Sequence, residues 1–115
     1  MGIEKLLPLP EATFYILIAL GSGDRHGYAI LQEVEAATGG KLRMGAGTLY
    51  RSLQRMLEQG LIEETTERPA PEEDDERRRY YRITALGREA ALAEARRLAG
   101  MVRLAQASGI APEVL

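Results

Sequence analysis

The chain has 115 residues, of which 45% are hydrophobic and 28% are charged, and its formal net charge at pH 7 is −2. This length suits one domain with a modest core. The absence of cysteine excludes disulfides, thiolate zinc sites and a thiol nucleophile, and it fits a reducing, cytoplasmic compartment. We expect no membrane span, since no run of about 18 apolar residues occurs, and no signal peptide at residues 1–7.

Charge is unevenly distributed along the chain. Residues 41–59 carry four basic side chains and one acidic side chain, namely Lys41, Arg43, Arg51, Arg55 and Glu58. Five consecutive acids, Glu72–Glu76, are followed at once by Arg77–Arg79. Because phosphate contacts supply most of a protein's affinity for DNA, the basic segment is a candidate DNA-binding region.

The first predicted helix spans Glu11–Leu20 and follows a short extended segment in which Pro8 and Pro10 disfavour helix. It is apolar on nearly every side, with Phe14 and Ile18 among its large residues, which is typical of a helix buried on several faces. In so small a chain, we expect a second subunit to cover part of this helix.

A second helix is predicted for residues 28–38. The preceding segment 21–27, GSGDRHG, has the composition of a turn. Gly39 and Gly40 end the helix.

The third predicted helix runs from about Ala46 to Gln59 and stops at Gly60. Its apolar side chains fall on one stripe: Leu49, Leu53, Met56 and Leu57. The opposite face is polar and cationic, so this helix would be held by its stripe and would present a basic surface outward.

Two strands are predicted at 61–66 and 79–83, joined by a long loop into a hairpin, and Thr84 caps a last helix that reaches about Ser108. Gly100 either bends this helix or allows close approach of another backbone. The apolar positions of the helix recur every three or four residues: Ala91, Ala95, Leu98, Val102 and Ala105. Such a stripe on a lone helix calls for a symmetry mate.

The order of elements predicts a mainly α chain with a small β-hairpin. It is the order of a winged helix-turn-helix followed by a long C-terminal dimerisation helix. We expect a DNA-binding domain at residues 1–83 and a dimerisation helix and tail at 84–115.

Three segments resemble the PadR family of bacterial transcriptional regulators. They are HGYAILQEV (26–34), GTLYRSLQRMLEQGLI (47–62) and RRRYYRITALGREAAL (77–92), in the order and spacing of the family. The resemblance implies a winged helix with a dimerisation helix, of the short subgroup with one C-terminal helix, and repression relieved by a small molecule or another signal. Ala46 and Arg51 stand where many members have Pro, and Arg51 adds a donor toward DNA.

The candidate DNA-binding residues lie on the third helix, beside it and in the wing: Thr48, Tyr50, Arg51, Gln54, Arg55, Arg43, Arg77, Arg78 and Arg79. Arg pairs bidentately with guanine and Gln with adenine, whereas we expect Tyr50 to touch a phosphate or sugar. The alternative is an ordinary solvated helix face, with the wing arginines neutralising Glu72–Glu76.

A dimer interface is predicted from the first and last helices, at Phe14, Leu17, Ile18, Ala91, Ala95, Leu98, Val102 and Ala105. An effector would bind in an apolar cavity of this interface, near Phe14, Ile18, Leu98 and Val102.

Other kinds of site are not predicted. A single histidine, His26, with no cysteine argues against a metal site, and Gly45–Gly47 lacks the residues of a nucleotide-binding loop. We expect no cofactor and no enzyme activity. His26 would position the turn before the second helix, while Tyr28, Tyr80 and Tyr81 would pack in the core and sheet. The Arg/Glu pattern of the last helix, which includes Glu94 and Arg97, reads as a solvated face.

The prediction is therefore a homodimeric, sequence-specific DNA-binding regulator, a repressor, without a membrane partner. Its two recognition helices would enter major grooves about one helical turn apart on a near-palindromic operator. The alternative is a winged helix that binds a protein rather than DNA.

Overall fold

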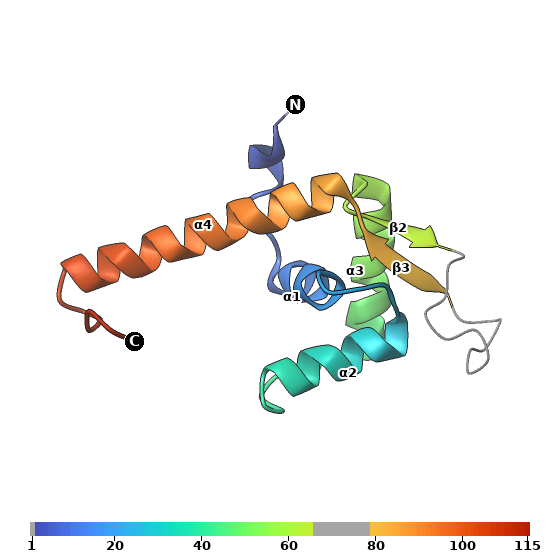
Figure 1. Cartoon of the computed structure of the whole chain (residues 1–115), viewed down its shortest axis with the longest axis horizontal. Helices are drawn as coiled ribbons and strands as arrows, with labels where there is room; N and C mark the ends of the chain where they lie inside the picture. The colour runs from blue at the N-terminus through green and yellow to red at the C-terminus, as the bar shows by residue number, and fades with distance from the viewer. Residues whose placement is uncertain (1, 66–78) are drawn as a thin grey trace.

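The computed structural model describes residues 2–65 and 79–115. Within these residues the elements are, in chain order, η1 (Ile3–Leu6), α1 (Glu11–Leu20), β1 (Arg25–His26), α2 (Gly27–Ala37), α3 (Ala46–Gln59), β2 (Ile62–Thr65), β3 (Tyr80–Ile83) and α4 (Ala85–Ala107). Figure 1 shows α1, α2, α3 and the sheet gathered into one body, from which α4 extends. The predicted fold class, a winged helix-turn-helix with a long last helix, is confirmed.

Helix α3 is held to the body by its apolar stripe. Leu49, Leu53 and Met56 are fully enclosed and belong to one cluster with Ile16 and Leu20 of α1. Truncation of such a side chain to Ala costs about 2–5 kcal/mol. The other side of α3 is left to solvent.

The sheet contains one strand more than predicted. In the described part of the chain it is antiparallel, with the order β1-β3-β2, and Arg25 of β1 pairs with Tyr81 of β3. The segment predicted to be only a turn supplies β1 because two contacts hold it. Asp24 Oδ2 accepts a hydrogen bond from Arg82 Nη2 at 2.9 Å, and Arg25 Nε donates to the Ala19 carbonyl at 2.8 Å.

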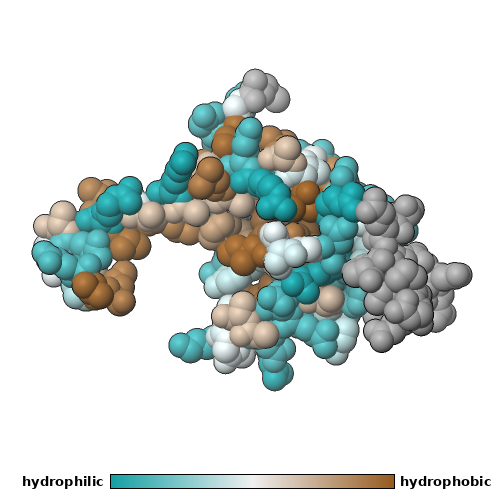
Figure 2. Space-filling view, viewed as in Figure 1, coloured by the Kyte–Doolittle hydropathy of each residue, from teal (hydrophilic) through white to brown (hydrophobic). Residues whose placement is uncertain are grey.

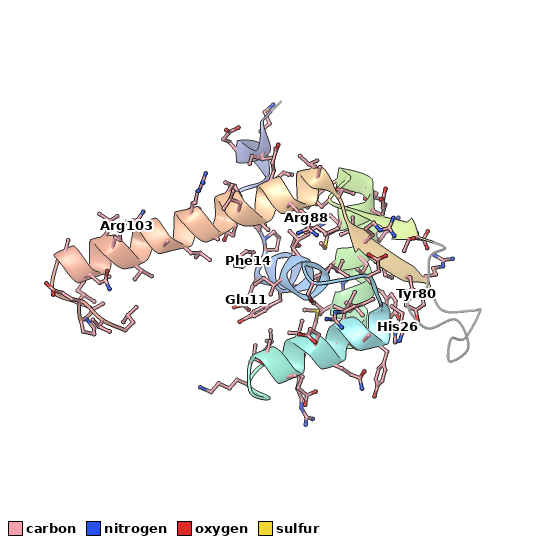
Figure 3. All side chains as sticks on the ribbon, in the orientation of Figure 1. Glu11, Phe14, His26, Tyr80, Arg88 and Arg103 are labelled. Atoms are coloured by element: carbon pink, nitrogen blue, oxygen red, sulfur yellow. The ribbon has the colours of Figure 1, made fainter. Side chains whose placement is uncertain are left out.

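The tyrosines near α2 behave differently from one another. Tyr80 and Tyr81 are buried in the sheet, as predicted, and the ring of Tyr80 meets His26 edge-on with centroids 5.3 Å apart (Figure 3). Tyr28 was expected in the core, and this is wrong, because 58% of it is exposed. His26 Nδ1 accepts a hydrogen bond from Ala29 N at 3.1 Å, which caps α2 and confirms that this histidine positions the turn.

Thr84 joins the start of α4 to the end of α3. Its Oγ1 accepts a hydrogen bond from Gly87 N at 3.0 Å and donates to the Gly60 carbonyl at 2.6 Å. Gly87 is buried against Leu61, and a β-carbon there would overlap the Leu61 carbonyl oxygen and lie 2.8 Å from Ile83 Cγ1. The first turn of α4 is therefore fixed to the body.

Glu94 makes a second attachment between α4 and the body. The prediction that it lies on a solvated face is wrong, because only 3% of Glu94 is exposed. Its Oε1 accepts hydrogen bonds from Leu9 N at 3.2 Å and from Arg97 Nε at 2.9 Å, and its Oε2 accepts one from Arg97 Nη2 at 2.7 Å. The hydrogen bonds from Arg97 and Leu9 hold the pKa of Glu94 below its usual range, against the opposing effect of burial.

Beyond this attachment, α4 leaves the body. We call residues 99–107 the α4 arm; Arg103 lies on it in Figure 3. Figure 2 shows apolar side chains gathered on the arm and on the tail that follows. The large exposed apolar residues there are Met101, Val102, Leu104, Ile110, Val114 and Leu115.

Candidate nucleic-acid interface

The outer face of α3 carries the predicted recognition residues. Since the core residues of α3 recur every three or four positions, the residues between them project away from the body. The exposed residues of α3 include Thr48, Tyr50, Arg51, Gln54 and Arg55. The structure thus brings together every residue that the sequence analysis assigned to this helix face.

Arg51 and Arg55 carry unneutralised charge on this face. Neither forms an ion pair with any residue that the structure describes. Arg51 Nη1 folds over the first turn of α3, 3.2 Å from where a β-carbon on Gly47 would stand. Gly45, at the N-cap, supplies no side-chain hydrogen bond to that turn. Positive charge and open backbone N–H groups therefore lie together, which favours an anion.

Tyr50 is positioned by the start of α2. A β-carbon on Gly27 would lie 2.6 Å from Tyr50 Oη. The phenol therefore packs against the Gly27 backbone, in space that a larger residue would occupy. More than half of Tyr50, 54%, is still exposed. Nearby, burial raises the pKa of the Tyr81 phenol and the Glu64 carboxylate raises it further. Tyr81 therefore adds no charge to this surface near neutral pH.

The flanking arginines differ from those on α3. Arg43 Nε lies 3.5 Å from Glu35 Oε2, and Arg79 Nε lies 3.5 Å from Glu64 Oε1, in pairs that are largely exposed. Exposed pairs of this kind contribute little to stability, roughly 0–1 kcal/mol, so they can exchange partners readily. The predicted wing residues Arg77 and Arg78, and the acidic run 72–76, lie outside the described residues.

A small recess opens beside α3, where it passes the first turn of α1. It has a volume of about 150 Å³ and is lined by Pro10, Thr13, Thr48, Arg51, Ser52 and Arg55. Sequence reasoning missed Thr13 and Ser52 as members of this surface. The available signal for Thr13 was a single threonine within the otherwise apolar and aromatic run ATFYILIAL.

A larger recess, of about 430 Å³, lies between α1 and α4. It brings together Phe14, Ile18 and Leu98 of the predicted interface, and also Glu94 and Arg97, which the sequence analysis had placed in solvent. Val102 is exposed on the arm and does not line it.

The other residues predicted at the dimer interface differ in how far they are buried. Leu17 is only 1% exposed and belongs to the protomer's own core, so its assignment to a subunit interface is corrected. Ala95 is exposed on α4, whereas Ala91 and Ala105 are partly buried.

The described residues lack two further features. They contain no group of three or more His, Cys, Asp or Glu side chains placed to hold a metal ion. They also contain no helix with the length and apolar content that a bilayer crossing requires.

Comparison with known proteins agrees with the fold. Residues 16–93 match the model of the transcriptional regulator PadR-like family. A 37.1 kDa protein encoded in a transposon of Streptomyces fradiae is 33% identical over 104 residues, which are 90% of this chain and 28% of that protein. The chain spans 28% and 57% of the lengths of two curated relatives that it matches.

Solved structures include the same architecture. A transcriptional regulator from Clostridium thermocellum superposes with a TM-score of 0.69 at 25% identity, over 81% of this chain and 84% of that one. Bacillus subtilis PadR, solved in complex with operator DNA, gives a TM-score of 0.61 at 19% identity, over 75% of this chain and 47% of its own. With its family match covering most of the winged helix, this chain belongs to the PadR-like family of transcriptional regulators.

Proposed function

We propose that the chain is a sequence-specific DNA-binding repressor that acts as a homodimer in the cytoplasm. The observation that carries the proposal is the outer face of α3, where Arg51 and Arg55 have no acidic partner among the described residues. A helix of this kind fits the major groove, and Arg and Gln on it can read guanine and adenine. Bacillus subtilis PadR, which shares the fold, has been solved with operator DNA.

The homodimer is proposed from the apolar surface that one protomer leaves open. Ile18 on α1 and Val102 on the α4 arm are both exposed, along with the other large apolar residues of the arm. A two-fold pairing of arms would cover this surface and would set the distance between the two α3 helices. In this arrangement residues 1–83 form the domain that contacts the operator, and residues 84–115, together with Ile18 of α1, contact the partner.

The recess between α1 and α4 is the proposed effector site. Its volume of about 430 Å³ lies within the range that small-molecule sites occupy, roughly 300–1,000 Å³. Its lining combines apolar side chains with the Glu94–Arg97 pair. An effector that binds better to a separation of the α3 helices that does not fit the operator would release the repressor, to the extent of that difference in affinity.

The test is the salt dependence of binding to DNA upstream of the gene. Replacing Arg51 or Arg55 with Ala removes one positive charge per protomer from the surface that faces the DNA, so the slope of log affinity against log salt should flatten by up to about 1.8 for a dimer. Arg96→Ala removes the same charge from an exposed position on α4 and should leave the slope unchanged. A wild-type protein that binds no DNA, or binds it independently of salt, would favour the alternative of a protein-binding winged helix.

A further inference from the structure

The recess beside α3 is lined by a buried threonine whose hydroxyl has no partner in the described part of the chain. Thr13 lines the recess and is only 3% exposed, yet its side chain makes no hydrogen bond within the described residues. Buried hydroxyls are normally satisfied, because leaving one unpaired costs stability. A buried threonine with an unpaired hydroxyl that lines a recess is a candidate contact for a bound group.

The charges around the recess define what that group would be. Arg51 and Arg55 line it and have no acidic partner in the described chain, and Thr48 and Ser52 add two more hydroxyls. All of these side chains can donate hydrogen bonds, and the two guanidinium groups are permanently positive. The recess is therefore suited to an anion with several acceptor oxygens.

The first turn of α1 adds to this preference. Pro10, at its N-cap, provides no side-chain hydrogen bond, and the backbone N–H groups at the start of a helix favour negative charge. The one acid of that turn, Glu11, does not line this recess but lines the separate recess between α1 and α4.

The size of the recess limits the anion. Its volume of about 150 Å³ is below the roughly 300 Å³ at which pockets for drug-sized molecules begin. It can admit one tetrahedral oxyanion with some water, but not a nucleotide or an aromatic acid as a whole. A phosphate group attached to a larger body outside the recess meets this limit.

We propose that this recess is a phosphate site, and that it takes one phosphate of the operator backbone between the first turn of α1 and the recognition helix. The inference rests on the proposed DNA-binding function, because the recess shares Thr48, Arg51 and Arg55 with the surface assigned to DNA. Its new element is Thr13, a residue of α1 that anchors the duplex by its hydroxyl. The site would fix the register of α3 in the groove without reading sequence.

The variants for the test are Thr13→Val and Thr13→Ser. Valine keeps the shape of threonine and removes a hydroxyl that has no partner in the free protein, so Thr13→Val should fold with equal or greater stability in urea. It should bind specific and non-specific DNA more weakly by the same factor, about tenfold for each half-site. Thr13→Ser restores the hydroxyl and should restore affinity. Reduced stability of Thr13→Val, or unchanged affinity, overturns the assignment to DNA.

Methylphosphonate substitution locates the contact. Neutralising the operator phosphates one at a time should reveal a position that weakens wild-type binding but does not further weaken Thr13→Val. Such non-additivity at one phosphate supports direct contact, since independent sites give additive losses. Additive losses at every position overturn it.

Inorganic phosphate, titrated without DNA and followed by amide NMR, distinguishes a free anion from the DNA backbone. We expect small chemical-shift changes at the Thr13 amide, with weak phosphate affinity, that are absent at the same position in Thr13→Val. Together with a loss of DNA affinity in that variant, they support the DNA backbone as the source of the bound phosphate. Tight phosphate binding that competes with DNA would show that the site exists but that its ligand is a free anion, which overturns the assignment to the DNA backbone. If the wild-type protein binds no DNA, the proposed function fails, and the phosphate titration alone decides whether the site exists.

Discussion

Replacing Glu94 with Gln tests the buried attachment between α4 and the body. Glu94 Oε1 accepts from Leu9 N and Arg97 Nε, and Oε2 accepts from Arg97 Nη2. Glutamine can keep an oxygen at the first position, but it places an NH₂ group opposite a guanidinium donor. One charge-assisted hydrogen bond is lost, and such bonds contribute about 1.5–3 kcal/mol. Because the Arg97 side chain is 34% exposed and can turn to water, we expect the low end, about 1.5 kcal/mol.

The pH dependence gives this prediction its sign. The pKa of Glu94 is lower in the folded chain than its ordinary value of 4.5, so the ionised form stabilises the fold. The contribution is fully present above the unfolded value, and it is lost as the pH falls below 4.5 and through the folded pKa. Urea unfolding at constant protein concentration should therefore show a gap between wild type and Glu94→Gln at pH 7 that closes in acid.

The matched control is Glu89→Gln, which changes an exposed carboxylate on the same helix. Its free energy of unfolding at pH 7 should differ from wild type by no more than about 0.5 kcal/mol. A gap for Glu94→Gln that stays constant from pH 7 to acid would refute the reasoning, because a protonated Glu94 loses the same interaction. An equal effect of Glu89→Gln would refute it as well.

Three glycines give further predictions. Gly87→Ala should lower the free energy of unfolding by about 3 kcal/mol or more in urea, because the Leu61 carbonyl cannot move away from the added carbon. Gly100→Ala should raise the free energy of unfolding by about 1 kcal/mol, since alanine has the higher helix propensity and the added carbon meets only the end of the Arg103 side chain at 3.8 Å. A lower free energy of unfolding, with dissociation of the dimer in sedimentation, would instead indicate a partner backbone at this position. Gly27→Ala should displace Tyr50 and weaken DNA binding in gel shifts while changing unfolding by less than about 1 kcal/mol. In a Tyr50→Phe background the same change should cost less affinity, and an equal cost would contradict the role of Tyr50 Oη.

The sequence was most informative where local signals agree. For α3, a leucine stripe, a glycine before the helix and Gly60 after it predicted the observed bounds Ala46–Gln59. Gly60 has a positive φ of 78°, which side chains rarely adopt, so the end of the helix is encoded at one residue. The exposed face of α3 then followed from helical spacing alone.

The missed features depend on contacts between distant segments. Strand β1 has two residues and exists through its pairing with β3, so the turn-like composition around Arg25 gave no local sign of it. Glu94 was read from charge pattern as solvated, yet it lies on the face where α4 packs against the N-terminal segment. Gly87, Ala90 and Glu94 are spaced three and four residues apart and so share one face of α4, and the two small residues on that face were the sequence signal for close packing against the body.

The joint at Thr84 has a mechanical consequence. The Thr84 hydroxyl links the carbonyl of Gly60, directly after α3, to the first turn of α4. The end of α3 and the start of α4 are therefore held rigidly together. Helix α4 has 23 residues, which corresponds to a rod of about 35 Å. Because Thr84 and Glu94 both hold α4 to the body, the two move as one unit, and rotating that unit by roughly 10° about the start of α4 moves the far end of the helix by about 6 Å. A small tilt of α3 therefore produces a large displacement at the end of the α4 arm. Conversely, a displacement of several ångströms at the end of the arm changes the angle of α3 by only a few degrees.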